Sequence, residues 1–417
     1  MRRLSATHTW FAYEAVASFF WTLSFTVAAV FFVLELGLSP LELVLVGTAM
    51  ELAVFVFEVP TGIVADTYGR KRSVVIGMFV LGGSYLLVGV STAAAGVIAA
   101  YAVWGLGWTF LSGAFDAWLA DEVGEERLAS VYHRGAQIDR VAGLLGIGVS
   151  VGLAQVDLRL PILVAGAGTI ALGMLLLVAM PETGFRPRPS EGRGQLAAMK
   201  ATGREGVRAV RGRPVLLAIL GIAAFGGMWS ETFDRLWEAH FLENVGLPGI
   251  GELDPVVWFG ILNAGSVVLA IALAVPLRKR LEDAGQARAA RVLFGLDAFL
   301  FASALVFALA GSLWLAVGAF WATRVARNVA GPVFDTWVQR SIGETDARAT
   351  VLSITNQADA VGQWTGGPFL GGLGNVFGIR AALAAGAFCM APALWLYGRA
   401  ARHDGRIEEL EADPAVV

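Results

Sequence analysis

Charged residues are scarce in this chain of 417 residues. Asp, Glu, Lys and Arg make up 16% of it, against about 25% in a typical soluble protein. The residues A, V, I, L, M, F, W, Y and C make up 56%, and 51 glycines come in addition. A water-soluble surface cannot be built from this composition. The net charge of −3 is less informative than the positions of the charges.

Cysteine and histidine are also scarce, and this excludes several kinds of site. The one cysteine, Cys389, lies within an apolar run, so neither a disulfide nor a thiolate metal centre can be built from it. No two of the four histidines have the spacing of zinc ligands on one helix. The sequence has no Gly-x-x-x-x-Gly-Lys phosphate loop and no nucleophile–base cluster. We therefore expect no metal, no cofactor, no nucleic-acid partner and no enzyme.

The apolar residues fall in runs of about 20 or more, the length that crosses about 30 Å of hydrocarbon as a helix. The first run is too long for the core of a signal peptide, so we expect a retained helix. The sequence predicts an all-α membrane protein in a lipid bilayer. Its twelve transmembrane helices are predicted at residues 10–36, 41–64, 73–93, 96–120, 132–155, 160–181, 214–242, 254–277, 289–310, 313–339, 349–373 and 377–398.

The positions of Lys and Arg predict the orientation of these spans. If both termini lie in the cytoplasm, Arg159 and Arg380 are the only two of the 31 Lys and Arg that fall in outer loops. The opposite orientation would place the basic segments outside. We therefore predict a multi-pass protein with both termini cytoplasmic.

The chain also shows an internal duplication. A loop rich in Pro, Gly and Arg, residues 182–213, separates two sets of six spans, residues 1–181 and 214–417. Phe-Asp-Ala-Trp at 115–118 matches Phe-Asp-Thr-Trp at 334–337, at the same place in each set. The sequence predicts two six-helix pseudo-symmetric halves joined by a cytoplasmic linker, which is the parallel-repeat architecture of a large transporter class.

The loop between spans 2 and 3 carries a motif. Residues 62–72 read Gly-Ile-Val-Ala-Asp-Thr-Tyr-Gly-Arg-Lys-Arg. This resembles the signature loop of the major facilitator superfamily, Gly-x-x-x-Asp-x-x-Gly-Arg-Lys/Arg, in the expected loop and on the expected side. Residues 58–62 and 115–118 resemble its drug-efflux branch, particularly the tetracycline- and macrolide-exporter-like members. The resemblance covers the whole chain and implies the major facilitator fold, with alternating access between two rocking halves.

The resemblance also implies a conformational latch. In the family, the Asp of this loop braces the other half near the start of span 11, and the basic cluster links to acids below span 4. Carried over, the latch residues are Gly62, Asp66, Gly69, Arg70 and Asp116. The basic cluster can also set the topology, which does not exclude a latch. The corresponding loop after span 8, residues 277–285, departs from the motif, so a latch there is degraded.

Two departures from the family pattern bear on the transport mode. The Gly-Pro-x-x-Gly-Gly run that antiporters often carry in span 5 is missing, and a similar run at residues 366–372 occurs in span 11 instead. The usual Arg early in span 4 is replaced by Trp104 and Trp108, while span 10 carries Arg324 and Arg327. Both departures count against an antiport assignment.

Acidic groups at membrane depth are candidates for proton coupling, because an unpaired charge there costs several kcal/mol. Glu51, near the middle of span 2, is our first choice, and a static hydrogen bond to a neighbouring helix is the alternative. In span 7, Glu231, Asp234, Arg235 and Glu238 fall on one stripe of the helix. These residues either carry protons or bind a cation, with Asp234 as the best candidate, or pair with one another as an outer gate.

Span 10 carries two arginines one turn apart near the midplane. Arg324 and Arg327 are expected to pair with an acid such as Asp359 of span 11, itself a proton-coupling candidate, or to bind an anionic group of the substrate. We assign Asp335, near the end of span 10, a structural role and leave Asp297 without one.

Aromatic side chains are abundant, with 13 Trp and 25 Phe, and would suit a pocket for lipophilic, aromatic or cationic compounds. Most of them should face lipid or pack between helices. Spans 1, 4 and 7 face the central cavity in the resembled family, and on that resemblance we expect Trp21, Phe25, Trp108, Trp229 and Trp237 to contact substrate.

We therefore expect a monomeric secondary transporter of the bacterial inner membrane that exports lipophilic small molecules such as drugs. Acids outnumber bases at membrane depth, which points towards protons or cations as the coupled species, and we expect proton-coupled antiport. The alternative is a dedicated exporter or importer of a specific metabolite, anion or lipid.

Overall fold

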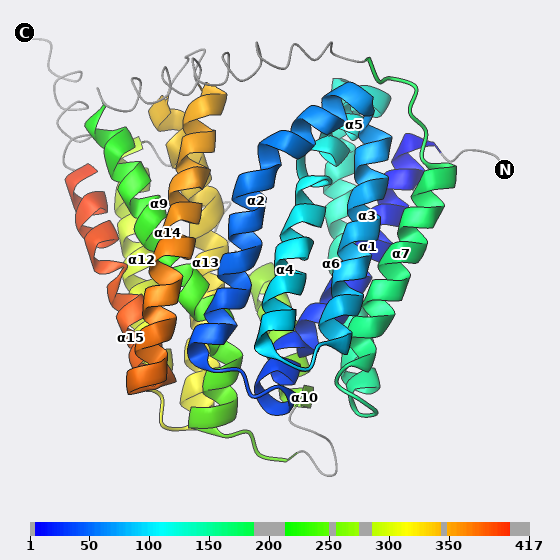
Figure 1. The fold of residues 1–417 in the computed structure, drawn as a ribbon. Helices are drawn as coiled ribbons and strands as arrows, with labels where there is room; N and C mark the ends of the chain where they lie inside the picture. Colours follow the sequence, from blue (N-terminus) through cyan, green and yellow to red (C-terminus); the bar gives the residue numbers. More distant parts are fainter. Residues whose placement is uncertain (1–4, 187–212, 250–255, 275–285, 343–347, 401–417) are drawn as a thin grey trace, which may run out of the picture. The chain divides into compact units, whose positions relative to one another are not determined.

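The computed structural model describes residues 5–186, 213–249, 256–274, 286–342 and 348–400, and in these it shows helices and no strand (Figure 1). Most of the predicted linker, residues 187–212, and the predicted loop at 277–285 lie outside this part. By internal contacts the chain divides into two units. Unit 1 comprises Met1–Ser190 and Leu247–Ala264, and unit 2 comprises Glu191–Gly246 and Gly265–Val417.

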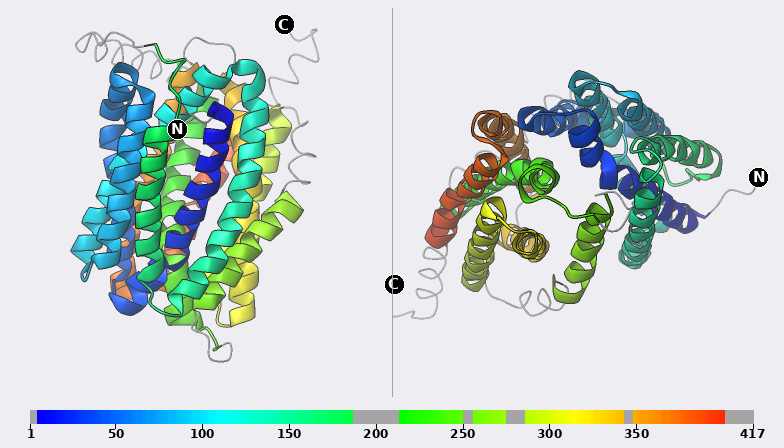
Figure 2. Two further views of the ribbon diagram at one scale, coloured as in Figure 1. Left: turned by 90° about the vertical axis from the view of Figure 1, so that its right-hand side faces the viewer. Right: turned by 90° about the horizontal axis from the view of Figure 1, so that it is seen from below.

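The helices of unit 1 run roughly parallel or antiparallel to one another (Figures 1 and 2). Three pairs make the main contacts, α1 with α6, α2 with α4, and α3 with α7. In chain order they are α1 (Ala6–Val30), which continues as a π-helical turn η1 (Phe31–Glu35), α2 (Pro40–Tyr68), α3 (Arg70–Val90), α4 (Ala94–Thr109), α5 (Ser112–Val123), α6 (Glu125–Ala154) and α7 (Leu160–Ala179).

Local sequence explains where α2 begins and ends. Ser39 and Glu42 form a capping box at its start, in which each side chain binds the other residue's backbone N–H. At its end, Gly69 has a φ of +114°, a conformation that side chains with a Cβ rarely adopt. α3 begins at the next residue, so one glycine makes the whole turn of the signature loop.

The predicted span at 96–120 is two helices in the structure. α4 ends at Thr109 and α5 begins at Ser112, with a turn between them in which the Leu111 N–H binds the Trp108 carbonyl. Gly107 and Gly113 lie close to the break, and glycine weakens a helix interior by about 1 kcal/mol relative to alanine.

Unit 2 repeats the pairings of unit 1. α9 contacts α14, α13 contacts η3, and α12 contacts α15. Its helices are α9 (Pro214–His240) with the π-helical turn η2 (Phe241–Val245), α12 (Gln286–Leu309), α13 (Leu313–Ile342), α14 (Arg348–Phe377) and α15 (Ile379–Phe388). α10 (Val256–Leu269) with η3 (Ala270–Ala274) begins in unit 1 and ends in unit 2.

Small residues allow the closest helix crossing in unit 2. A Cβ on Gly362 of α14 would collide with the backbone carbonyl of Ala224 in α9. In unit 1, a Cβ on Gly146 of α6 would lie 2.6 Å from the Phe19 carbonyl oxygen in α1. The two equivalent helix pairs therefore touch backbone to backbone, as is common for membrane helices with small residues at the interface.

Ten segments in the described part of the chain are long and apolar enough to cross a membrane. They fall on ten of the predicted spans. The other two predicted spans correspond to α13 and α14, which are 30 residues long but more polar, with Arg324, Arg327 and Asp335 in α13 and Asp359 in α14. The all-helical membrane fold is confirmed, and the number of twelve crossing helices stays a prediction.

Candidate functional site

An ion-pair network joins α9 and α13 in unit 2. Nη1 of Arg327 donates hydrogen bonds to both carboxylate oxygens of Asp234, each 2.7 Å long. Nη1 of Arg324 lies 3.8 Å from the same carboxylate. The arginines are one turn apart on α13, so both reach across to the one acid on α9. Arg327 also lies over the ring of Trp229, with its guanidinium carbon 5.5 Å from the ring centre.

The other acids of this region have different partners. Glu231 accepts a hydrogen bond of 3.1 Å from Arg235, one turn along α9. Oε2 of Glu238 is buried and has no hydrogen-bond partner among the described atoms. The expected pairing of the two arginines with Asp359 is not found, because Asp359 accepts a hydrogen bond of 2.7 Å from Gln363 on its own helix.

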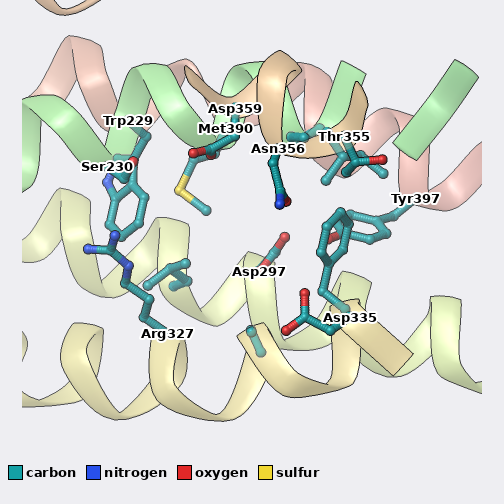
Figure 3. A pocket seen from close by; sticks show the side chains of 18 of the residues that line it. Trp229, Ser230, Asp297, Arg327, Asp335, Thr355, Asn356, Asp359, Met390 and Tyr397 are labelled. Carbon is teal, nitrogen blue, oxygen red and sulfur yellow. The ribbon is translucent and has the colours of Figure 1, made fainter. Parts of the chain in front are cut away.

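A cavity of about 370 Å³ lies among the helices of unit 2. Its walls come from α9, α12, α13, α14 and the span Ile379–Ala400 (Figure 3). Small-molecule sites typically have volumes of about 300–1,000 Å³, so the cavity can hold a small organic molecule. Its polar lining residues are Ser230, Asp297, Arg327, Asp335, Thr355, Asn356, Asp359, Gln363 and Tyr397.

The two ends of the cavity differ in chemistry. Trp229 and Arg327 lie together at one end, next to the ion-pair network (Figure 3). Asp297, Asp335 and Tyr397 lie towards the other end (Figure 3). The first end presents an aromatic ring, an arginine that is already paired and the Asp359 carboxylate, and the second presents the carboxylates of Asp297 and Asp335.

Four aromatic side chains of the first and fourth predicted spans form a cluster in unit 1. Trp21 stacks on Phe25, with ring centres 5.0 Å apart, and meets Trp104 edge to face at 4.9 Å. Trp104 stacks on Trp108 with an interplanar angle of 9°. Trp21 is 37% exposed, so the cluster presents an accessible aromatic surface.

The remaining candidates lie in more enclosed places. Trp237 is 5% exposed and stacks on Phe320 with ring centres 4.4 Å apart, within an aromatic core. Trp229 is also buried, but it reaches the cavity. Glu51 lies in α2, partly buried, and lines neither this cavity nor the smaller one below.

The signature loop is tied to its neighbours within unit 1. Arg70 forms a salt bridge of 2.5 Å with Asp121 of α5 and donates a hydrogen bond to the Ala117 carbonyl. Asp116 lies elsewhere, where it accepts a hydrogen bond of 3.0 Å from the Tyr132 hydroxyl of α6. The structure therefore connects Arg70 to Asp121 and not to Asp116.

Asp66 lines a smaller cavity of about 170 Å³ in unit 1, together with Gly62 and Arg70. The turn that follows is fixed by Glu182, which accepts a hydrogen bond of 2.8 Å from the Lys71 backbone N–H. Glu182 also lies against Gly69, where a Cβ would come within 3.2 Å of its carboxylate.

Sequence reasoning missed several of these positions. Asp297 carried a usable signal, since it is an isolated acid within an apolar span, but no partner could be named for it. Tyr397 and Asn356 carried none, because their position in a cavity depends on how five helices pack. Trp104 and Asp121 were passed over in favour of Trp108 and Asp116, which lie four and five residues away. In the residues that the structure covers, no group of three or more His, Cys, Asp or Glu could hold a metal ion.

The model of the family described as the Major Facilitator Superfamily matches residues 9–356. The chain belongs to this superfamily. A relative, the uncharacterized MFS-type transporter YxaM of Bacillus subtilis (strain 168), is 26% identical over 210 residues, which are 49% of this chain and 51% of that protein. The chain thus matches about half the length of this relative.

Solved structures of superfamily transporters share the fold. The peptide transporter POT in complex with sulfate has a TM-score of 0.72 at 16% identity, covering 95% of each chain. A bacterial homologue of the human lysosomal transporter Spinster, inward-facing and occupied, also has 0.72, at 14% identity over 95% of this chain and 96% of that one. A mutant of the nucleoside transporter NupG has 0.73 at 12% identity, covering 95% of this chain and all of the other.

The family and the fold are those of multi-pass membrane transporters and not those of enzymes. The likeness to these structures extends to the fold alone, since the identities are low. The drug-efflux branch, the coupling ion and the roles of individual residues stay predictions.

Proposed function

We propose that the protein is a secondary active transporter that exports lipophilic small molecules such as drugs in exchange for protons. The observation that carries the proposal is the Asp234 carboxylate, which Arg327 holds with two hydrogen bonds of 2.7 Å beside a cavity lined by Trp229. A carboxylate at membrane depth that is balanced by an arginine and lies next to a cavity is a natural carrier for a transported proton.

Protonation of Asp234 would change the cavity. The proton neutralises the carboxylate and so weakens both charge-assisted hydrogen bonds from Arg327. Asp359 and Glu231 both attract Arg327 electrostatically. The released guanidinium therefore moves towards these two acids. Because Arg327 lines the cavity and covers Trp229, this movement alters the charge and the aromatic surface that a substrate meets. Loss of the proton on the other side of the membrane restores the pair.

The other candidate residues take secondary places in this proposal. Glu51, Glu231, Glu238 and Asp359 are further carboxylates that could carry the proton. Substrate contacts are proposed for the aromatic cluster of unit 1, which contains Trp21, Phe25 and Trp108 and in which Trp21 is exposed, and for Trp229 and Trp237 of unit 2. Trp104, which the structure places between the members of the unit 1 cluster, joins them.

The proposed orientation rests on the Lys and Arg of the whole chain, and the proposed latch rests on unit 1. We propose that both termini are cytoplasmic in a bacterial inner membrane, on the distribution of Lys and Arg. The latch proposal keeps Gly62, Asp66, Gly69 and Arg70, since the turn at Gly69 and the salt bridge from Arg70 hold the signature loop in place. We propose that Asp116 contributes to the latch only as a residue of α5, the helix that also carries Asp121.

A dedicated carrier of a metabolite, anion or lipid is the second candidate, and one observation favours it. Nε of Arg324 is buried and has no hydrogen-bond partner among the described atoms, and its Nη1 lies 3.8 Å from Asp234. This guanidinium therefore has donor capacity for an anionic group of a substrate.

The test is transport by the purified protein in proteoliposomes with an imposed pH gradient, followed with a fluorescent lipophilic cation. We expect gradient-driven movement in the wild type, its loss in Asp234→Asn and little change in Asp157→Asn, which alters an exposed loop carboxylate. The variant Glu51→Gln distinguishes Glu51 from Asp234 as the coupling carboxylate, and we expect this variant to retain gradient-driven transport.

Two other outcomes would indicate a different coupling site or the second candidate function. If Glu51→Gln abolishes the gradient response while Asp234→Asn keeps it, the coupling site lies in α2. If the wild type moves no lipophilic cation but binds an organic anion that Arg324→Gln fails to bind, the second candidate is correct.

A further inference from the structure

The far end of the unit 2 cavity contains a carboxylate that the proposed coupling does not use. Asp297 of α12 is 9% exposed, and its polar partner is the hydroxyl of Tyr397, which donates a hydrogen bond to it. Tyr397 itself is 2% exposed. A buried carboxylate at the wall of a cavity has about four lone-pair sites, so one hydrogen bond leaves Asp297 able to accept more.

Hydrogen-bond donors along the cavity wall are mostly engaged. The Thr355 hydroxyl donates to the Val351 carbonyl and the Ser230 hydroxyl to the Gly227 carbonyl, each within its own helix. At the Trp229 end, the amide of Gln363 donates to Asp359 and the guanidinium of Arg327 to Asp234. The amide of Asn356 is a further donor in the wall, but the three carboxylates together offer acceptor sites in excess of donors, so a complementary ligand must supply donors.

The charges of the cavity also favour a ligand that supplies hydrogen-bond donors. Asp297, Asp335 and Asp359 line the cavity, and Arg327, the one arginine among the described residues of its wall, is already paired with Asp234. The three carboxylates are spread along the cavity (Figure 3), and the structure finds no acid cluster that could hold a metal ion in the residues it describes. The complement is therefore an extended organic cation.

Access and shape complete the site. Asp335 and Asn356 are exposed and lie at the carboxylate end, so a ligand can enter there. The Tyr397 ring flanks this end (Figure 3), Phe334 also lines the cavity, and aromatic rings attract an ammonium group. Met390 lies between this end and Trp229 and supplies an apolar wall (Figure 3).

We propose that Asp297 and Asp335 form an ammonium subsite, which binds the protonated primary amine of an organic molecule whose apolar part extends past Met390 towards Trp229. The subsite rests on the proposed function, since it names the class of substrate, lipophilic amines, that the same cavity would take.

The test uses the full-length protein in nanodiscs of phosphatidylcholine and phosphatidylglycerol. A dansyl-alkylammonium probe and its neutral N-acetyl analogue are titrated by fluorescence. We expect the wild type to bind the ammonium probe at least about tenfold more tightly than the neutral probe. Asp297→Asn should weaken ammonium binding by about ten- to hundredfold and leave the neutral probe unchanged. Glu243→Gln, an exposed acid away from the cavity, is the matched control and should bind both probes as the wild type does.

Equal binding of the two probes by the wild type, or an unchanged preference in Asp297→Asn, would overturn the subsite. If Asp297→Asn does not give folded protein, the exposed Asp335→Asn decides. It should reduce the preference for the ammonium probe about three- to tenfold, and an unchanged preference would overturn the proposal.

Two further arms separate related explanations. Phosphatidylethanolamine added to the nanodiscs competes with the probe if the occupant is the lipid's own ammonium headgroup, and does not compete if the occupant is a soluble amine. Transport along a pH gradient is measured on the same preparations. An ammonium preference without gradient-driven transport removes the proposed function and leaves the subsite, and the reverse result removes the subsite alone.

Discussion

The two units build their first helix in the same way. α1 carries Trp21 and Phe25 one turn apart and stacked, and α9 carries Trp229 and Phe233 in the same arrangement, with ring centres 5.0 and 5.5 Å apart. Each helix then continues into a five-residue π-helical turn, η1 and η2. Each also crosses a glycine-containing partner helix at close range. The scaffold around the Trp–Phe pair is therefore shared.

The partner that faces this pair differs between the units. The shift in residue number that relates Asp116 to Asp335 also relates Trp108 of α4 to Arg327 of α13. Trp108 joins an aromatic cluster, whereas Arg327 covers Trp229 and holds Asp234. At this position of the repeat, unit 1 therefore has a side chain of an aromatic cluster where unit 2 has an arginine of a charged network. We attribute substrate contact to both surfaces and proton coupling to the second.

The largest expected effect tests this difference directly. Arg327→Gln removes both hydrogen bonds to Asp234, so we expect gradient-driven transport to fall about a hundredfold, or about 2.7 kcal/mol. Trp108→Phe keeps an aromatic ring against Trp104, so we expect a change of less than about fivefold. The measurement is the initial rate of dye transport in proteoliposomes, at matched amounts of folded protein. Equal losses in the two variants would contradict the division of roles.

A smaller effect tests the close helix crossing that both units contain. Gly362→Ala places a Cβ against the Ala224 carbonyl, and overpacking of this kind costs about 1–3 kcal/mol. Gly146→Ala in unit 1 should act in the same direction, since its Cβ would lie 2.6 Å from the Phe19 carbonyl oxygen. Thermal unfolding in detergent measures both. Gly372→Ala, where a Cβ would meet open space, is the control, and a control as unstable as Gly362→Ala would refute the close crossing.

The smallest effect concerns the signature loop of unit 1. Asp121→Asn removes the carboxylate that pairs with Arg70, but the Asp121 side chain is 35% exposed. Partly exposed ion pairs contribute less than about 1 kcal/mol, so the unfolding temperature should fall only slightly, and less at high salt because salt screens the pair. A loss as large as that in Gly362→Ala, independent of salt, would show that the salt bridge holds the unit together.

The fold was largely predictable, because its main signal is local. Apolar runs of membrane-spanning length and the matched Phe-Asp-x-Trp segments are visible without any tertiary contact, and Gly69 marks the end of α2. The break between α4 and α5 was not predicted, since both halves of that span are apolar. The reduced apolarity of α13 and α14 follows from the polar residues that they contribute to the cavity.

The site was predictable only in part. Asp234 and the two arginines stood out as charges at membrane depth, but their pairing depends on the rotation of α9 against α13, which sequence spacing does not define. Asp359 was expected to pair with the arginines and binds Gln363 instead. Asp297 had no visible partner because Tyr397, its hydrogen-bond donor, lies a hundred residues away in the chain.

The measurement that tests the central claim most directly is substrate-evoked proton movement. A pH-sensitive dye inside proteoliposomes records proton flux when a lipophilic cation is added without an imposed gradient. The account predicts proton movement opposite to substrate movement in the wild type and none in Asp234→Asn, while Asp157→Asn behaves as the wild type. Substrate movement without proton movement in the wild type, or unchanged proton movement in Asp234→Asn, would contradict it.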